Sequence, residues 1–274
     1  MGLLEAFLCL IIGFAVAVPS SMAGLGGGFL IVPILILVFQ LPAQNAVAIS
    51  IVAICGTTVS ATIAYVRQKR VDHMLGLLYD LLDIPGVAIG AYLTTLFPSN
   101  LLAGIVGVFM MVISTTLMLH NRKLSKEKPE ASNVKGMVWK RRKVDSSGKV
   151  FEYIIRKPPL ALVSSFAGGL VTGLSGLGGG ITDTATMILL GVPPHIAVAS
   201  SEFAMALTNA TGVVAHGLLN NILLEYALPI TIGTIIGAQV GSYFCKYVGE
   251  KTLKKILAII AFFIGIRLAL FVMS

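Results

Sequence analysis

Charged residues are scarce in this sequence, and cysteines are scarcer still. Lys, Arg, Asp and Glu make up 12% of the chain, which is roughly half the share found in soluble domains. The three cysteines, Cys9, Cys55 and Cys245, lie in apolar stretches and lack the spacing of metal ligands. We therefore expect small core cysteines, and neither a soluble domain nor a disulfide framework.

Catalytic signatures are missing as well. The sequence contains no HExxH motif and no pair of cysteines in one span, and it has no Walker-type glycine loop that would cradle a nucleotide. A membrane-embedded metalloenzyme and a nucleotide-driven pump therefore find no support. We expect a chain that is not an enzyme and that carries neither a cofactor nor a metal.

Hydrophobic residues are abundant. They make up 56% of the 274 residues, and the mean hydropathy is +0.92. Apolar runs such as 101–119 and 256–273 match the roughly 20 residues that a helix needs to cross a bilayer. The N-terminus enters such a run without a preceding basic region, so we expect no cleaved signal peptide. These features predict an all-α, multi-pass protein of the cell membrane.

The basic residues are unevenly placed along the chain. Twelve of the 20 Lys and Arg residues lie between Arg122 and Lys157, and further clusters occur at 67–70 and 246–255. Basic clusters beside hydrophobic spans indicate loops on the cytoplasmic side. The net charge of +8 therefore predicts the lipid bilayer as the partner, not nucleic acid, and it predicts a cytoplasmic central segment.

The sequence contains an internal repeat. Three motifs of the first half recur in the second half in the same order: "GLGGG" at 24–28 and 176–180, "LPAQNAVAIS" at 41–50 and "VPPHIAVASS" at 192–201, "GVAIGAY" at 86–92 and "GAQVGSY" at 237–243. Similarity sustained in one order indicates duplication, which is how many secondary transporters are built. The chain divides into a first membrane repeat at 1–120, a basic cytoplasmic linker at 121–158 and a second membrane repeat at 159–274.

Each half holds five apolar segments, and the second segment of each is short. The segments at 27–40 and 179–191 are only about 13 residues long, which at ~1.5 Å per residue make a helix of only ~20 Å. Both follow a glycine run, so they predict broken or re-entrant helices. In the linker, "VWKRRKV" and "KVFEYII" alternate in polarity around "DSSG", which predicts a small β-hairpin.

The charges of the loops predict that the two halves are inverted relative to one another. The loop at 67–70 is basic, whereas its counterpart at 218–225 contains no Lys or Arg. The connections at 98–100 and 246–255 differ in the opposite sense, the first uncharged and the second basic. By the positive-inside rule the halves face opposite ways, and both termini lie outside the cytoplasm.

The glycine runs have two interpretations. In one, small residues only let helices pack closely. In the other, each run ends one segment and opens the next, so that bare N–H groups at a positive helix N-terminus hold an anion inside the membrane. We favour the second, because the break repeats and precedes a short segment both times.

These motifs resemble the TauE/SafE family of sulfite-exporter-like permeases. The resemblance rests on "GLGGGFLIVPIL" with "LPAQNAVAIS", and on "GLSGLGGGITDTATMILLGVPPHIAVASSEFAMALTNATGVVAHG". It covers the apolar chain but not the linker, and it implies transport of small anions such as sulfite, sulfonates or sulfoacetate. The second half departs from the first, because "TDTAT" stands where "LIVPI" stood, and this asymmetry argues against two equal sites.

Polar residues near the glycine runs are the candidates for binding the anion. Serines align across the repeats, because Ser201 corresponds to Ser50, and Asn209 continues the same segment. The candidate substrate-binding residues are Gly26, Gly27, Gly28, Gly178, Gly179, Gly180, Ser50, Ser200, Ser201 and Asn209.

Ionisable residues inside the membrane are costly and therefore mark candidate proton sites. Asp183 either titrates beside the anion or caps its own helix. Glu202, His195 and His216 lie at spacings of seven that share one helix face, although His195 could instead lie in a loop at the interface. Asp80 and Asp83 either relay protons or pair with the loop at 67–70. Arg267, near the end of the last span, is expected to reach back to the membrane interface.

We therefore expect a secondary transporter of small anions that works by alternating access between inverted halves, with proton coupling. An anion channel and a transporter of small carboxylates are the alternatives. The oligomeric state, the direction of transport and the coupling ion are not determined by the sequence.

Overall fold

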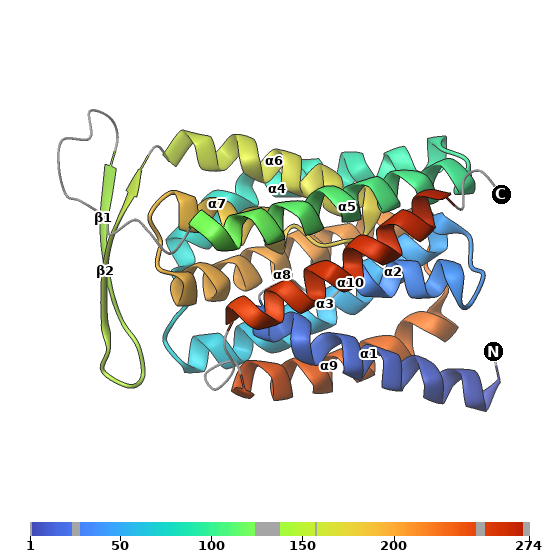
Figure 1. The fold of residues 1–274 in the computed structure, drawn as a ribbon, viewed down its shortest axis with the longest axis horizontal. Coiled ribbons are helices and arrows are strands. Elements are labelled where there is room, and N and C mark those ends of the chain that lie inside the picture. The colour runs from blue at the N-terminus through green and yellow to red at the C-terminus, as the bar shows by residue number, and fades with distance from the viewer. Residues whose placement is uncertain (1, 24–27, 124–137, 157, 245–249, 271–274) are drawn as a thin grey trace.

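The computed structural model describes residues 2–23, 28–123, 138–156, 158–244 and 250–270. These residues form a bundle of helices with a two-stranded hairpin across one end, which we call the hairpin end (Figure 1). Helix α1 begins and helix α10 ends at the opposite end of the bundle. In chain order the elements are α1 (Leu3–Ala23), α2 (Gly28–Leu37), α3 (Ala43–Arg67), α4 (His73–Leu96), α5 (Ser99–Lys123), β1 (Val138–Val144), β2 (Val150–Arg156), α6 (Pro158–Ser175), α7 (Gly180–Leu189), α8 (Pro194–Leu218), α9 (Leu224–Phe244) and α10 (Glu250–Leu270).

The two short segments become the two shortest helices of the described chain. Helices α2 and α7 have 10 residues each, which at ~1.5 Å per residue gives ~15 Å, about half of a bilayer core. Each is followed by a turn into a helix of 25 residues, α3 or α8. Figure 1 shows α7 toward the hairpin end and α2 toward the opposite end. Both are broken helices that do not cross the bundle.

Helices from the first and second parts of the chain pack in pairs. Helix α1 lies along α9, and α6 lies along α4. Helix α3 contacts α9, and α8 contacts α4. The remaining large contacts join α3 to α8 and α5 to α10. If each helix from α1 to α5 is exchanged with the helix numbered five higher (α1 with α6, α2 with α7 and so on), the same set of pairs results.

Glycines allow two of these pairs to approach at backbone distance. A Cβ on Gly86 of α4 would lie 2.6 Å from the carbonyl oxygen of Phe166 on α6. A Cβ on Gly237 of α9 would likewise lie 2.6 Å from the carbonyl oxygen of Phe14 on α1. Side chains do not fit at such distances, so both crossings require glycine. Small residues of this kind are the usual means by which membrane helices pack closely.

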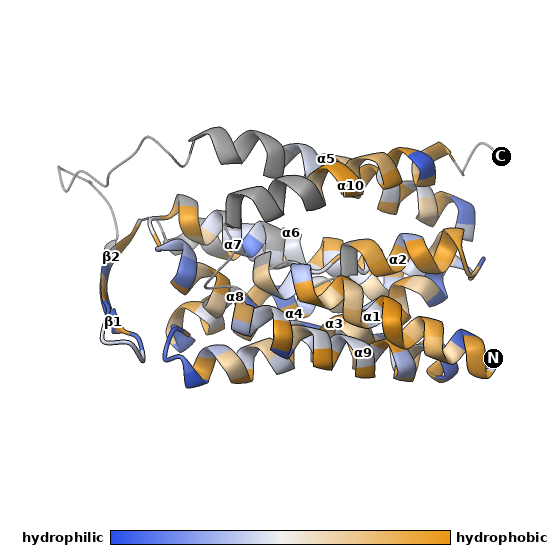
Figure 2. Ribbon diagram, turned by 60° about the horizontal axis from the view of Figure 1, so that its bottom comes forward, coloured by the Kyte–Doolittle hydropathy of each residue, from blue (hydrophilic) through white to orange (hydrophobic). Residues whose placement is uncertain are grey.

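The surface of the bundle is apolar, and buried polar side chains face inward. On α4, Leu77 and Leu81 are 51% and 66% exposed, whereas Asp80 and Asp83 are buried. Figure 2 shows hydrophobic residues along most of the helix lengths and hydrophilic ones mainly at helix ends and on the hairpin. Among the described helices, three are by themselves long and apolar enough to span a membrane: Leu3–Met22, Ala43–Arg67 and Leu224–Phe244. The fold is that of an all-α, multi-pass membrane protein.

The hairpin forms where the alternation in the linker predicts strands. Strands β1 and β2 pair antiparallel, with Val138 opposite Arg156 and Val144 opposite Val150. The Oδ1 atom of Asp145 accepts hydrogen bonds from the backbone N–H groups of Ser147 and Lys149, at 2.9 and 3.0 Å. This Asx-type turn closes the hairpin.

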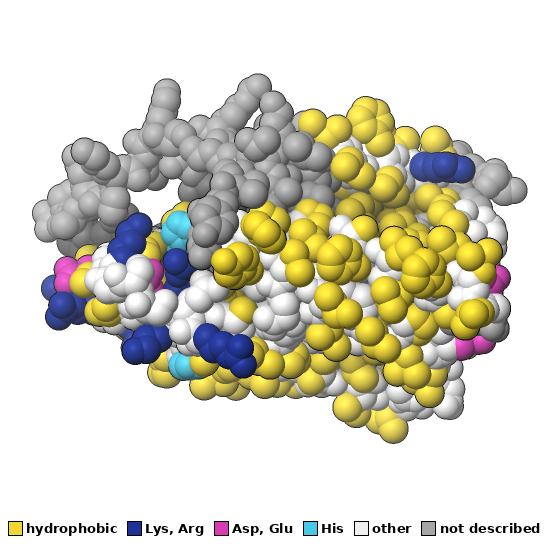
Figure 3. All heavy atoms as spheres, turned by 90° about the horizontal axis from the view of Figure 1, so that it is seen from below, with side chains coloured by type: hydrophobic (Ala, Val, Ile, Leu, Met, Phe, Trp, Pro, Cys, Tyr) yellow, Lys and Arg dark blue, Asp and Glu magenta, His cyan; other side chains and the backbone are white. Residues whose placement is uncertain are grey.

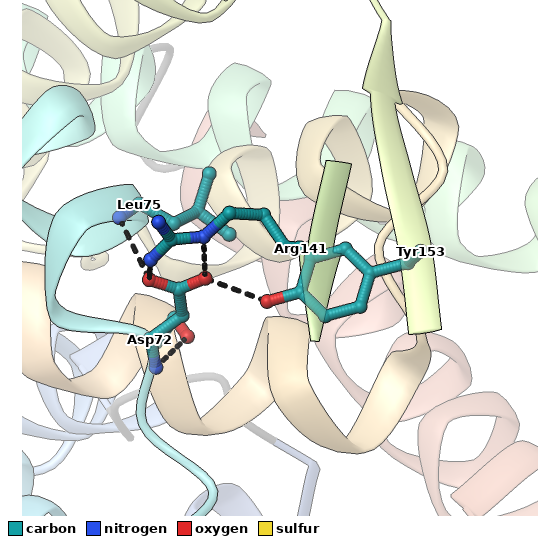
Figure 4. Close-up of polar contacts among 5 residues, drawn as sticks. Asp72, Leu75, Arg141 and Tyr153 are labelled. Atoms are coloured by element: carbon teal, nitrogen blue, oxygen red, sulfur yellow. Dashed lines mark hydrogen bonds and ion pairs between the residues drawn. The ribbon is translucent and has the colours of Figure 1, made fainter. Parts of the chain in front are cut away.

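A buried carboxylate ties the hairpin to the start of α4. Asp72, the N-cap residue of α4, accepts hydrogen bonds from Nε of Arg141 at 2.9 Å and from the hydroxyl of Tyr153 at 2.6 Å (Figure 4). Burial alone would raise the pKa of Asp72, but these hydrogen bonds and the charge of Arg141 outweigh it and hold the pKa below its usual value. The carboxylate therefore stays charged and holds both strands.

The face of the hairpin that carries Tyr153 also packs on the second part of the chain. A buried apolar cluster joins Phe151 and Ile155 of β2 to Leu75 of α4 and to residues around the end of α7, including Leu190. Gly191, with φ +101°, brings its backbone under β2, where a Cβ would lie 2.5 Å from the carbonyl oxygen of Ile154. The hairpin thus contacts helices on both sides of the linker.

Candidate functional site

Three buried aspartates gather beside a threonine inside the bundle. Asp80 and Asp83 lie on one face of α4, and Asp183 lies on α7. Thr208 of α8 directs its hydroxyl at Oδ1 of Asp80, 2.7 Å away, and at Oδ2 of Asp83, 3.3 Å away. None of the four side chains is more than 4% exposed. We call these four residues the acid cluster.

The backbone of α6 brings two of the carboxylates together. A Cβ on Gly168 would lie 3.3 Å from Oδ1 of Asp183 and 3.5 Å from Oδ1 of Asp83. The two carboxylates therefore approach the same point of α6, and they interact electrostatically with each other. Only a residue without a side chain leaves this space open, because a Cβ would also lie 2.9 Å from Oγ1 of Thr182.

The cluster lies well inside the bundle. Helix α4 begins at His73 at the hairpin end. At ~1.5 Å per residue, Asp80 and Asp83 lie roughly 10–15 Å along it. Thr208 lies 14 residues into α8, which begins at Pro194, or roughly 20 Å along the axis. This depth is where ionisable side chains in membrane proteins are usually functional.

The second glycine run opens α7, and the first turn of that helix is occupied by its own carboxylate. Gly176 and Gly178 adopt φ of +64° and +82°, which glycine tolerates. Gly179 is the N-cap residue, and a Cβ on it would lie 3.3 Å from Oδ2 of Asp183. A helix N-terminus attracts anions through its partial positive charge. Asp183 therefore places its carboxylate at the end of α7 that would attract an anionic ligand.

Positive side chains are absent from the part of this interior that the structure describes. No Lys or Arg occurs among the buried side chains of the described residues, whereas Asp80, Asp83, Asp183 and Glu202 all do. A buried carboxylate without a nearby cation is costly when it is charged. The arrangement can therefore bind and release protons, because a proton removes that cost.

A polar row on α8 continues from the acid cluster. Glu202, Asn209 and His216 are all 0% exposed, in line with the shared face that their spacing of seven predicts. Nδ2 of Asn209 donates to the carbonyl oxygen of Met205 at 2.7 Å, and Nε2 of His216 lies 3.1 Å from the carbonyl oxygen of Gly173.

The second glycine run is tied to the first half of the chain. The hydroxyl of Ser50 on α3 donates to the carbonyl oxygen of Gly176 at 2.8 Å. Gly176 also packs on α3, since a Cβ there would lie 2.9 Å from the carbonyl oxygen of Val47. In the first glycine run, Gly28 is the first residue of α2, whereas Gly26 and Gly27 lie outside the described residues.

Other predicted site residues lie apart from the acid cluster. Ser200 accepts a hydrogen bond from the backbone N–H of Asp72 at 2.9 Å, below the hairpin. The hydroxyls of Ser201 and Thr184 are 2.6 Å apart and join α8 to α7. His195 is exposed in the first turn of α8. The structure thus groups Gly178, Gly179, Gly180, Ser50 and Asp183 around one break, and it places Ser200 and His195 nearer the hairpin end.

Two members of the site are missed by reasoning from the sequence. Thr208 is an ordinary helical threonine until α4 and α8 are packed together, and Gly168 is one of many small residues in its segment. The sequence signals for the cluster are the ionisable Asp183 beside the second glycine run and the spacing of Asp80 and Asp83 by three residues, which places these two on one helix face.

Comparisons with known proteins find relatives that are named as membrane transporters or as members of an exporter family. The chain is 33% identical over 269 residues to the "Probable membrane transporter protein YunE" of Bacillus subtilis, covering 95% of this chain and 96% of that one. It is 25% identical to the "Probable membrane transporter protein YfcA" of Escherichia coli K12, covering 93% and 84% of the two chains. It is 22% identical to the "Sulfite exporter TauE/SafE family protein 3" of Arabidopsis thaliana, covering 86% and 71%. No solved structure gives a significant match.

A family model covers almost the whole chain. The model described as "Sulfite exporter TauE/SafE" matches residues 9–268, which include the acid cluster, the second glycine run and the hairpin. The family consists of membrane transporters and not of enzymes. The motifs quoted from the two repeats, the all-α membrane fold and this match agree, and the chain belongs to the sulfite exporter TauE/SafE family.

Proposed function

We propose that the protein is a secondary transporter that moves small anions of the sulfite, sulfonate or sulfoacetate type across the cell membrane together with protons, by alternating access. One observation carries the proposal. The carboxylate of Asp183 lies beside Gly179 at the N-terminal end of α7, and it belongs to a group of buried acids with no described Lys or Arg among the buried side chains.

This geometry couples an anion to a proton. When Asp183 is charged, its carboxylate lies near the positive end of α7 and repels a second anion. A proton on Asp183 removes that charge, so the N–H groups of the first turn become available to a sulfite or sulfonate oxygen. Anion and proton therefore stabilise each other's binding, which is the requirement for transport in the same direction.

The remaining acids extend the path of the proton. Asp83 approaches the same point of α6 as Asp183, and Thr208 connects Asp83 to Asp80, which is nearer the start of α4. A proton that leaves Asp183 thus has two neighbouring carboxylates on which to move toward the hairpin end. Glu202 and His216, buried on α8, are further candidates for the same role.

The helix pairing supports alternating access between inverted halves. The set of helix contacts is unchanged when each helix is exchanged for its counterpart in the other half, and α2 and α7 lie toward opposite ends. Inverted repeats arrange broken helices in this manner around a central site. The hairpin and the basic loop at 67–70 share one end of the bundle, which supports a cytoplasmic hairpin end, with both termini outside.

Purified protein reconstituted in liposomes tests the proposal. Melting temperatures measured with a panel of sulfite, thiosulfate, sulfonates and small carboxylates identify the ligand, because a ligand of the folded state raises the melting temperature. Uptake of that anion is then measured with and without an inward proton gradient. We expect the gradient to stimulate uptake.

Two variants separate coupling from folding. Asp183→Asn keeps the shape of the side chain and is expected to abolish stimulation by the gradient. Thr231→Val is the control, because Thr231 lies in the other half, outside the acid cluster, and its hydroxyl bonds only to the carbonyl oxygen of Ala227 in its own helix. If uptake by the unmodified protein does not respond to the gradient, the proposal of proton coupling is wrong. If the protein conducts ions faster than a carrier can turn over, it is a channel and not a transporter.

A further inference from the structure

A second polar site lies at the hairpin end, apart from the acid cluster. A cavity of about 330 Å³ opens between strand β1 and the turn that joins α3 to α4. We call it the seam cavity, and the residues that line it are Val66, Lys69, Val71, His73, Arg142, Lys143 and Val144. Three of these residues are Lys or Arg, one is a histidine, and none of the seven is acidic.

The cations of the seam cavity are not neutralised by their neighbours. Arg70 and Arg141, which lie beside it, are held by Asp145 and Asp72. Arg142 lies 3.6 Å from Glu152, but the two side chains are 69% and 72% exposed, so the pair is weak. Among the described residues, Lys69 and Lys143 have no ion-pair partner. The cavity therefore keeps a surplus of positive charge.

The walls of the cavity are fixed relative to each other. The backbone N–H of Ser146 in the hairpin turn donates to the carbonyl oxygen of Gln68 at 3.0 Å. Arg70 and Asp145 form an ion pair of 3.5 Å across the same seam, and Asp145 is almost fully buried. Lys69 has φ +55°, at a place where the other half has Asn220 with φ +57°. Asparagine is the residue better suited to this backbone, and lysine adds a charge there.

The cavity lies where the apolar surface of the bundle ends. Val66 and Val144 line it and are 42% and 44% exposed. Figure 3 shows Lys, Arg and His side chains gathered at the hairpin end, directly beside the hydrophobic surface that covers the helices. In a membrane this is the depth of the lipid headgroups, and basic pockets at that depth bind anionic headgroups.

We propose that the seam cavity binds a phosphate group, held by Lys69 and Lys143, and that in the membrane this phosphate belongs to the headgroup of an anionic phospholipid. Val66 and Val144 contact the first part of its acyl chain. The ligand joins the hairpin to the end of α3, so it stabilises the docked hairpin. This site is independent of the transport proposal, because it shares no residue with the acid cluster.

Melting temperature in detergent provides the test. Phosphatidylglycerol, phosphatidylcholine and inorganic phosphate are added separately, the last against chloride at equal ionic strength. The double variant Lys69→Gln/Lys143→Gln is compared with Lys140→Gln, which removes a charge from the same strand outside the cavity. The unliganded melting temperature of each variant shows whether it folds.

We expect phosphatidylglycerol, and not phosphatidylcholine, to raise the melting temperature of the unmodified protein. The apparent affinity should fall roughly 5-fold for each lysine removed from the cavity, and Lys140→Gln should leave it unchanged. A shift with inorganic phosphate alone, lost in the same double variant, would keep the phosphate site but overturn its lipid source. An equal loss in Lys140→Gln, or no shift with either phosphate compound, would overturn the site.

Discussion

Two regions of the molecule occupy corresponding places in the two halves of the chain, and only one of them is charged. The alignment of the repeats assigns each member of the acid cluster a counterpart: Thr231 for Asp80, Thr234 for Asp83, Ile31 for Asp183 and Thr57 for Thr208. Thr234 of α9 and Thr57 of α3 both donate to the carbonyl oxygen of Ala53, at 3.0 and 2.9 Å. In this second region the two threonine hydroxyls therefore bond to a backbone carbonyl oxygen, and none of its four residues is a carboxylate.

The two regions resemble each other in how their helices pack, and they differ in whether they contain ionisable side chains. The two regions lie at corresponding helix contacts, α4 with α8 and α9 with α3, and in each a threonine hydroxyl bonds across the contact. Of the two regions, only that of α4, α7 and α8 holds groups that bind protons. Glu202 on α8 shows the same difference between the halves, since its counterpart on α3 is the apolar Ile51. The two halves of the chain thus contain corresponding regions that differ in charge, and we infer that the charged one carries the coupling.

The largest expected effect is a loss of stability from filling the glycine crossings, which occur in both halves of the chain. Gly86→Leu and Gly237→Leu each force a side chain against a carbonyl oxygen of the partner helix, and each should destabilise the protein by about 3 kcal/mol or more. Melting curves in detergent measure the loss, with Gly217→Ala as the control, since a Cβ on Gly217 meets only one atom, at 3.8 Å. A loss in one half and not in the other would show that the two crossings are not equivalent.

Next in size is the effect of removing the charge that distinguishes the two regions. Asp83→Thr gives the acid cluster the residue of its counterpart, and it should reduce proton-driven uptake on the order of 100-fold. Thr234→Ser, which keeps the hydroxyl of the counterpart, should leave uptake near that of the unmodified protein. Both are measured in liposomes with an imposed pH gradient. Equal uptake by the two variants would place the coupling elsewhere.

Much of the scaffold follows from sequence patterns, because each pattern is local. Apolar runs locate the described helices, the glycine runs precede the broken helices, and alternating polarity marks the hairpin. The acid cluster is different, because its contacts are long-range. Thr208 and Asp80 are 128 residues apart in sequence, and only the packing of α8 on α4 reveals that they meet.

The docking of the hairpin is likewise invisible in the sequence. Asp72 precedes a helix and is recognisable as an N-cap residue, but nothing local indicates that Arg141 and Tyr153, about 70 and 80 residues further on, complete its hydrogen bonds. The role of Ser200 is also not visible in the sequence. The sequence predicts it as an anion ligand, whereas in the structure its hydroxyl accepts a hydrogen bond from the backbone N–H of Asp72.

A smaller effect is expected from the hydroxyls that the two regions have in common. Thr208→Val removes the donor shared by Asp80 and Asp83 and should lower the free energy of unfolding by about 1–3 kcal/mol, because it leaves buried acceptors unsatisfied. Thr57→Val removes only a bond to the carbonyl oxygen of Ala53 in its own helix, and it should cost less than about 0.5 kcal/mol. Chemical denaturation of the purified variants gives both values, and similar losses would mean that the carboxylates do not depend on Thr208.

The smallest effect distinguishes the two ends of the bundle, since only one carries the hairpin. Because the folded-state pKa of Asp72 is below its usual value, its contribution to stability is fully present above the usual pKa and is lost as the pH falls through the folded-state pKa. Tyr153→Phe should lower the free energy of unfolding by about 1 kcal/mol at neutral pH. Melting temperatures followed from neutral pH into the acid range should show a steeper decline for the unmodified protein than for Asp72→Asn, which has no charge to lose. Parallel declines would mean that the hairpin is held by its apolar face, through Phe151 and Ile155, and not by the carboxylate.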